Sequence, residues 1–172
     1  MRTLAETVIT EAAVAAGIPV SAVMDKPDKE TVLLPSRRLQ LEFLPASLRP
    51  ASRMVAKFPT ASHPETHRTV RRQAYERTFL VRAEIVSDDE SWLEDAVLQF
   101  LSALPRRVAD GSGNLVTVEA LKAELGGFGG KLVEVFTRRR TAIHIQFTGM
   151  ICRDRDVELI REVNLVDNVS AK

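Results

Sequence analysis

Two histidines offer the first chance of chemistry in this chain. His63 and His67 are four residues apart, a spacing that on a helix would place both imidazoles on one face and allow metal binding. Pro64 and the loop-like composition around it work against a stable helix, and the segment contains no cysteine. We therefore expect these histidines to bind no metal.

Acidic residues near the C-terminal end could in principle bind Mg²⁺. Arginines alternate with these acids, so the charges neutralise one another, and a solvated strand or arm is the better interpretation. The acids are Asp154, Asp156, Glu158 and Glu162, and the arginines are Arg153, Arg155 and Arg161.

A glycine-rich segment at 126–131 has a superficial likeness to a phosphate-binding loop. Such a loop needs four residues between its glycines and then Lys followed by Ser or Thr, whereas here Leu132 follows Lys131 and the spacing is shorter. A flexible hinge is the better interpretation. A serine nucleophile would need an elbow motif, and the sequence has none. We therefore expect no catalytic residues, no cofactor, no metal and no enzymatic activity.

Clustered charge is more informative than these candidates. Segment 45–72 carries one acid, Glu65, against six basic residues: Arg49, Arg53, Lys57, Arg68, Arg71 and Arg72. Acids gather instead over 88–95, beginning with Asp88, Asp89 and Glu90. This segregation favours complementary surfaces of a self-assembling subunit. Solvated clusters and, for the arginines, contact with DNA phosphates remain alternatives.

Composition is ordinary for a globular protein. The chain has 172 residues, 45% of them hydrophobic and 27% charged, with a formal net charge of +1 that gives no global attraction to nucleic acid. We expect a single domain over 1–172, with a long basic loop or hairpin at 45–72 and a C-terminal arm at about 153–172. Cys152 is the only cysteine, which excludes an intrachain disulfide. We expect neither a signal peptide nor a membrane span.

Hydrophobic periodicity predicts two amphipathic helices, over 4–16 and 89–104. Thr3 with Glu6, and Ser87 with Glu90, have the spacing of capping boxes. The second helix should place four residues against a sheet: Trp92, Val97, Phe100 and Leu104. Alternation predicts strands at 38–44 and 73–86, with apolar residues inward and charged residues outward. One alternative for the long segment is an extended hairpin in which 53–58 pairs with 69–75.

The segment 131–163 predicts a further hairpin. Residues 132–136 and 141–151 alternate, and Thr137 to Arg140 separates them as a polar tip containing Arg138, Arg139 and Arg140. Residues 115–118 predict a strand and 121–125 a helical turn. Hairpin connections imply an antiparallel sheet. The expected fold is therefore α+β, an antiparallel sheet with two helices packed on one face, plus the long hairpin or loop extension.

The order of these elements resembles the tail terminator, or tail completion, proteins of bacteriophages. The resemblance rests on Leu-Pro-Ser-Arg-Arg-Leu-Gln-Leu-Glu-Phe at 34–43, the strand-to-helix segment 78–104, and Gln-Phe-Thr-Gly-Met-Ile-Cys-Arg-Asp at 146–154. It implies a virion protein, present in the host cytoplasm during assembly. Such a protein forms a hexameric ring that caps the tail tube and connects the tail to the head or neck.

The same resemblance implies partners. They are other copies of the chain, the tail tube protein, and sheath, neck or head-completion proteins, while DNA passes through the lumen of the ring. Two alternatives stay open, another neck or baseplate component and a non-viral DNA-binding module. The Arg138–Arg140 segment is expected to contact a neighbouring protein, with the DNA path as the weaker alternative.

Overall fold

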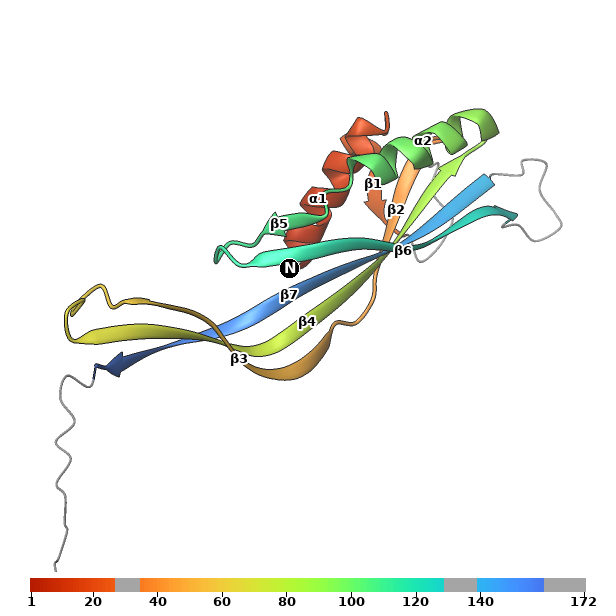
Figure 1. Ribbon diagram of the computed structural model, residues 1–172. Helices are drawn as coiled ribbons and strands as arrows, with labels where there is room; N and C mark the ends of the chain where they lie inside the picture. Colours follow the sequence, from red (N-terminus) through yellow and green to blue (C-terminus); the bar gives the residue numbers. More distant parts are fainter. Residues whose placement is uncertain (27–34, 129–138, 160–172) are drawn as a thin grey trace, which may run out of the picture. The chain divides into compact units, whose positions relative to one another are not determined.

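The computed structural model describes residues 1–26, 35–128 and 139–159. Its helices and strands are labelled in Figure 1. In chain order they are α1 (Arg2–Ala15), the 3-10 helix η1 (Val20–Ala22), β1 (Val23–Asp25), β2 (Arg38–Phe43), β3 (Ser47–Pro59), β4 (His67–Ser87), α2 (Glu90–Ala103), β5 (Arg107–Ala109), β6 (Leu115–Phe128) and β7 (Arg139–Glu158).

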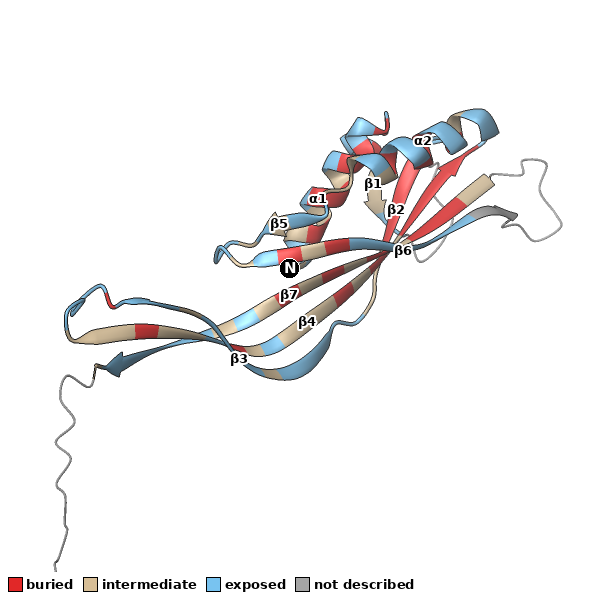
Figure 2. Ribbon diagram, viewed as in Figure 1, coloured by how far each residue is buried: buried red, intermediate tan, exposed pale blue. Residues whose placement is uncertain are grey.

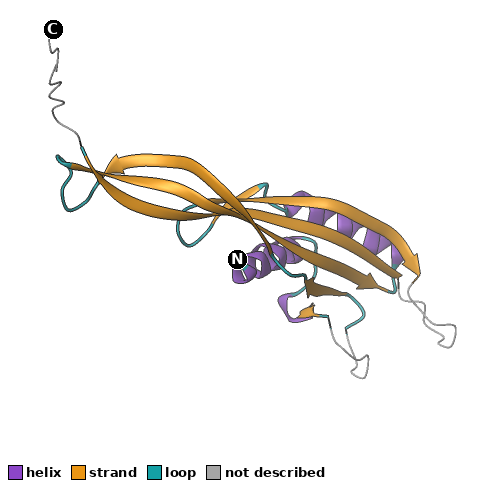
Figure 3. Cartoon of the chain, turned by 90° about the horizontal axis from the view of Figure 1, so that it is seen from below, coloured by secondary structure: helices purple, strands orange, loops and turns teal. Residues whose placement is uncertain are grey.

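The sheet is mostly antiparallel and strongly curled, so the expected α+β class is confirmed. Six strands follow the order β1-β2-β4-β7-β6-β5, and β3 pairs with β4 off this path. Figure 3 shows the strands in orange and the helices in purple. One pair departs from the prediction, because β1 runs parallel to β2, with Val23 opposite Leu39. The sheet is therefore mixed.

The chain divides into two compact units. The first contains 1–49 and 76–150, and the second contains 50–75 and 151–172. Strands β3, β4 and β7 contribute residues to both units. We call the described part of the second unit, residues 50–75 and 151–159, the ribbon. It consists of β3 with the first part of β4 and the last part of β7.

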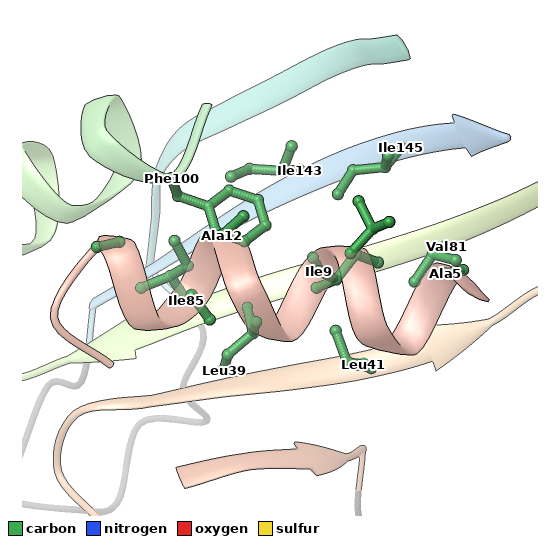
Figure 4. Close-up of a cluster of buried hydrophobic side chains, with 14 of the residues drawn as sticks. Ala5, Ile9, Ala12, Leu39, Leu41, Val81, Ile85, Phe100, Ile143 and Ile145 are labelled. Carbon is green, nitrogen blue, oxygen red and sulfur yellow. The ribbon is translucent and has the colours of Figure 1, made fainter. Parts of the chain in front are cut away.

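The hydrophobic core belongs to the first unit. Both helices and strands β2, β4, β6 and β7 contribute to one cluster of buried side chains (Figure 4). Helix α1 supplies Ala5, Val8, Ile9, Ala12 and Ala13, and α2 supplies Leu93, Ala96, Val97 and Phe100. Trp92 and Leu104 are partly buried against the same cluster. The predicted apolar spacing of both helices is thus what positions them.

Neither predicted capping box is present. Helix α1 begins at Arg2, so Thr3 lies inside it, and the Glu6 carboxylate accepts a 2.8 Å hydrogen bond from Arg2 instead. At α2 the cap is Asp89, whose Oδ1 accepts a hydrogen bond from the Trp92 backbone N–H at 3.1 Å. Each prediction was wrong because the helix begins at a neighbouring residue, which changes the side chain that can reach the free N–H groups.

The β6–β7 hairpin is longer than predicted. Strand β6 continues through 121–128, with Ala123 opposite Ile143 and Phe128 opposite Arg139. The helical turn at 121–125 was therefore wrong, as was a hinge at 126–128. Residues 119–124 are exposed, so their side chains carry no alternating burial signal, and the backbone ladder with β7 holds this segment in the sheet.

The predicted arginine tip is also wrong for two of its three members. Arg139 and Arg140 are half-buried residues of β7, paired with β6, because the ladder extends across them. Arg138 and the predicted strand at 132–136 lie outside the described residues, as does 31–34.

The face of β2 and β4 that alternation assigns to solvent is more buried than predicted. Arg38 and Gln40 are buried, as is Glu84, although all three were expected to face outward. The Glu84 carboxylate forms an ion pair with the Arg82 guanidinium at 2.8 Å and lies 3.7 Å from the Lys26 ammonium. Lys26 also pairs with Glu42, and this hydrogen bond lowers the pKa of the Glu42 carboxyl. The buried charge of Glu84 is therefore neutralised by neighbouring cations, as burial requires.

We predict that Phe100→Ala lowers the free energy of unfolding by about 3–5 kcal/mol, because the ring is fully buried and its loss leaves a cavity. Leu98→Ala is the matched control, since Leu98 lies on the same helix but is 67% exposed. Urea denaturation would measure both. A loss below about 1 kcal/mol for Phe100→Ala would contradict the assignment of α2 to the core.

Candidate interaction surface

The ribbon has no apolar core of its own. Every buried hydrophobic residue among those described belongs to the first unit, and the buried side chains of the ribbon are polar: Thr60, Thr69 and Gln73. Figure 2 shows β3 exposed along most of its length. The larger apolar side chains of the ribbon are exposed, namely Met54, Val55, Phe58, Tyr75, Ile151 and Val157. Isolated strands require a buried hydrophobic face to be stable, so this surface is the best candidate for a partner.

This arrangement corrects two predictions. Tyr75 and Ile151 were expected on the buried face of their strands, yet they are 40% and 39% exposed. Their alternation is that of a strand, but they lie in the ribbon, whose described residues include no buried hydrophobic side chain.

One face of the ribbon is internally neutralised. The Arg71 guanidinium donates two hydrogen bonds to the Asp154 carboxylate, each 2.8 Å long, and lies over the Phe58 ring. Thr69 Oγ1 donates to Asp156 at 2.6 Å and lies 3.1 Å from Thr60 Oγ1. These contacts align β4 and β7 antiparallel and identify the side chains that share this face.

Electrostatics follow from this pairing. The hydrogen bond from Arg71 lowers the pKa of the Asp154 carboxyl, and the same bond raises the pKa of the guanidinium. A carboxyl with a lowered pKa in the folded state stabilises the fold above its ordinary pKa. That contribution is lost as the pH falls through the lower, folded-state value. Both groups are exposed, so the pair fixes strand register more than it stabilises the fold.

The opposite face of the ribbon carries positive charge without acids. Since successive side chains of a strand alternate between faces, the neighbours of Thr69, Arg71, Asp154 and Asp156 point the other way. We call the charged residues of this side the basic face: Arg53, Lys57, Arg68, Arg72, Arg153 and Arg155. Val55, Val70, Ile151 and Val157 lie between them. Within the ribbon segments 50–59, 67–75 and 151–158, no Asp or Glu occupies this face.

The six basic residues of 45–72, predicted to share one surface, lie at different places in the structure. Four of them, Arg53, Lys57, Arg68 and Arg72, lie on the basic face, and the Arg68 guanidinium also donates to the Pro64 carbonyl. Arg71 lies on the other face, and Arg49 is an exposed residue of the first unit.

Arg153 and Arg155 were missed as members of this surface. Sequence reasoning paired them with the acids beside them, Asp154 and Asp156. Strand alternation, already visible in the sequence, separates neighbouring residues onto opposite faces and would have revealed them.

The acidic start of α2 is mostly satisfied within its own unit. Arg37 pairs with Asp89 at 3.1 Å, and its guanidinium lies over the Trp92 ring. Arg139 forms an ion pair with Glu90. Asp88 is exposed. Two of the three predicted acids therefore have partners already, which weakens the idea that this helix start is the complement of the basic segment.

The histidines lie at the turn between β3 and β4. Their rings are 5.6 Å apart, and His67 Nδ1 is 2.8 Å from the Thr66 hydroxyl. Within the ranges that the structure describes, no group of three or more His, Cys, Asp or Glu side chains could hold a metal ion. In the same ranges, no helix is long and apolar enough to cross a membrane.

We predict that Arg71→Gln raises the pKa of Asp154 toward its ordinary value, because the charged hydrogen-bond donor is lost. Arg72→Gln is the control, since it removes one positive charge from the opposite face of the same strand. Carbon-detected NMR titration of the side-chain carboxyl would follow both. An equal pKa in Arg71→Gln and the wild type would show that the pair does not form in solution.

Comparison with known proteins gives no family for this chain. No protein-family model matches the sequence, and no curated protein matches it.

Proposed function

We propose that this protein is a structural subunit of a bacteriophage tail, a tail terminator. In this role it forms a ring, with six copies as the expected number, that caps the tail tube and connects the tail to the head or neck. The observation that carries the proposal is the ribbon, whose exposed apolar and cationic side chains have no cover from the described part of the chain.

A ribbon of this kind suits a subunit that completes its structure by assembling. The first unit supplies a stable core, with both helices and the strands in one buried cluster. The ribbon gains little from folding alone, because its buried residues are polar and its ion pair is exposed. Covering its apolar residues with a partner would stabilise the ribbon and the assembly together.

The layout behind the resemblance supports the finer proposal. Strand β2 lies within 34–43, the segment 78–104 holds the end of β4 followed by α2, and β7 includes 146–154. A protein at the same place in the particle could instead be another neck or baseplate component. Only its position would separate that alternative from a terminator.

The basic face favours one second candidate, a non-viral module that binds DNA through phosphates. Arginine is suited to bidentate phosphate contacts, and five of the six residues of this face are arginines. This candidate predicts DNA affinity of the isolated protein that falls steeply with salt.

Assembly with tail tubes is the direct test. The protein would be imaged by negative-stain microscopy alone and after mixing with tubes of the tail tube protein from the same genome. We expect rings of one size, tube ends capped by them, and no further growth of capped tubes. A protein that never associates with tubes would exclude a terminator, and salt-sensitive DNA binding in that case would favour the second candidate.

A further inference from the structure

We infer that the basic face of the ribbon binds the outer face of α2 on a second copy of the chain, through Glu94, Asp95 and Leu98. This inference rests on the proposed function only in requiring that like subunits assemble. It replaces the acidic start of α2 as the complement, because Asp89 and Glu90 are paired within their own unit.

The basic face lacks internal neutralisation. Asp154 and Asp156, the nearest carboxylates in the strand, are engaged on the other face by Arg71 and Thr69. Because Arg71 pairs with Asp154 across β4 and β7, the neighbouring Arg72 and Arg153 are cross-strand neighbours on the basic face. Like charges placed opposite one another destabilise a sheet. An external anionic surface would remove this repulsion.

The apolar residues of the same face favour protein over phosphate as the partner. Val55 is 37% exposed, Ile151 39% and Val157 43%. A phosphate backbone would neutralise the cations but leave these side chains in water. A protein surface could cover both kinds of residue, and interfaces enriched in arginine around apolar contacts are common between proteins.

The outer face of α2 offers the matching chemistry. Leu93, Ala96, Val97 and Phe100 are buried in the core, so Glu94, Asp95 and Leu98 face away from it and are exposed. Leu98 is 67% exposed and lies one turn from the two acids, which provides an apolar contact beside the charges. No ion pair involves Glu94 or Asp95 among the described residues.

Charge is divided between the units in the same sense. By sequence, the first unit has 15 Lys and Arg against 17 Asp and Glu, and the second has 9 against 6. Their formal charges of −2 and +3 therefore attract between copies. A contact between two different surfaces of like subunits is heterologous, and such contacts close into rings when the rotation allows.

Charge reversal on each side gives a decisive test. The first variant is Arg153→Glu with Arg155→Glu, and the second is Glu94→Arg with Asp95→Arg. All four side chains are exposed, and circular dichroism would verify folding. Arg106→Glu with Arg107→Glu is the control, because it changes charge equally at two exposed residues of the first unit outside the proposed contact. Sedimentation velocity, without tail tubes, would measure self-association.

We expect each of the two variants to self-associate roughly tenfold more weakly or worse, because the two reversed side chains of each variant then repel the charges that they attract in the wild type. The control should match the wild type. An equimolar mixture of the two variants should assemble again, since the reversed ribbon of one then meets the reversed helix of the other, and the two native surfaces also meet.

Three results would overturn the inference: normal assembly of the Glu94 and Asp95 variant, failure of the mixture to assemble, or a wild type that stays monomeric at high concentration. Loss of DNA binding with normal assembly in the Arg153 and Arg155 variant would identify phosphate as the partner instead. Wild-type rings that respond as expected but never cap tubes would refute the terminator and leave this contact intact. If wild-type rings cap tubes and both charge-reversed variants assemble normally, the terminator proposal would be supported and the proposed contact refuted.

Discussion

The confinement of apolar burial to the first unit is the constraint on which the rest of the structure depends. Each helix has 14 residues and is therefore about 21 Å long, whereas β4 has 21 residues and a contour length of about 70 Å. Phe79, Val81 and Ile85 occupy the part of β4 that contributes to the core. The part that belongs to the ribbon contains Arg68, Arg71 and Arg72. Sequence composition thus changes along one continuous strand, between the part that contributes to the core and the part that belongs to the ribbon.

Charge follows the same division. In the first unit several ions are paired at short range, as Arg82 is with Glu84 and Arg37 with Asp89. In the ribbon, alternation places the matched charges on one face and the unmatched cations on the other. The chain as a whole is close to neutral, with a formal charge of +1, so the imbalance is local. A local imbalance of this kind provides specificity in assembly without reducing solubility through a large net charge.

The periodic spacing of apolar residues predicted the core well, because a strand or helix that buries one side must place its apolar residues at that spacing. The alternation of Leu39 and Leu41, and the helical spacing of Val97 and Phe100, reflect one apolar side facing one core. The end of β6 was missed because residues 119–124 are exposed and only the ladder with β7 reveals them as strand. The parallel strand β1 has three residues, too few for a pattern.

The candidate surface was predicted only in part. The basic hairpin was visible as a cluster in the sequence, but the pairing of Arg71 with Asp154 joins residues 83 positions apart. No local signal reports such a contact. Once it is known, strand alternation assigns Arg72, Arg153 and Arg155 to the other face. The partners of Asp89 and Glu90 were hidden for the same reason, since Arg37 and Arg139 are distant in sequence.

Hydrogen exchange of the backbone amides tests the central claim most directly, namely that the ribbon depends on a partner for its cover. Exchange would be followed by mass spectrometry in dilute protein and in the assembled state. We expect slow exchange in α1, α2 and the strands of the core in both states. Peptides from 50–75 and 151–159 should exchange rapidly in dilute protein and become protected on assembly. Ribbon amides as protected as the core in dilute protein, and unchanged by assembly, would contradict the account.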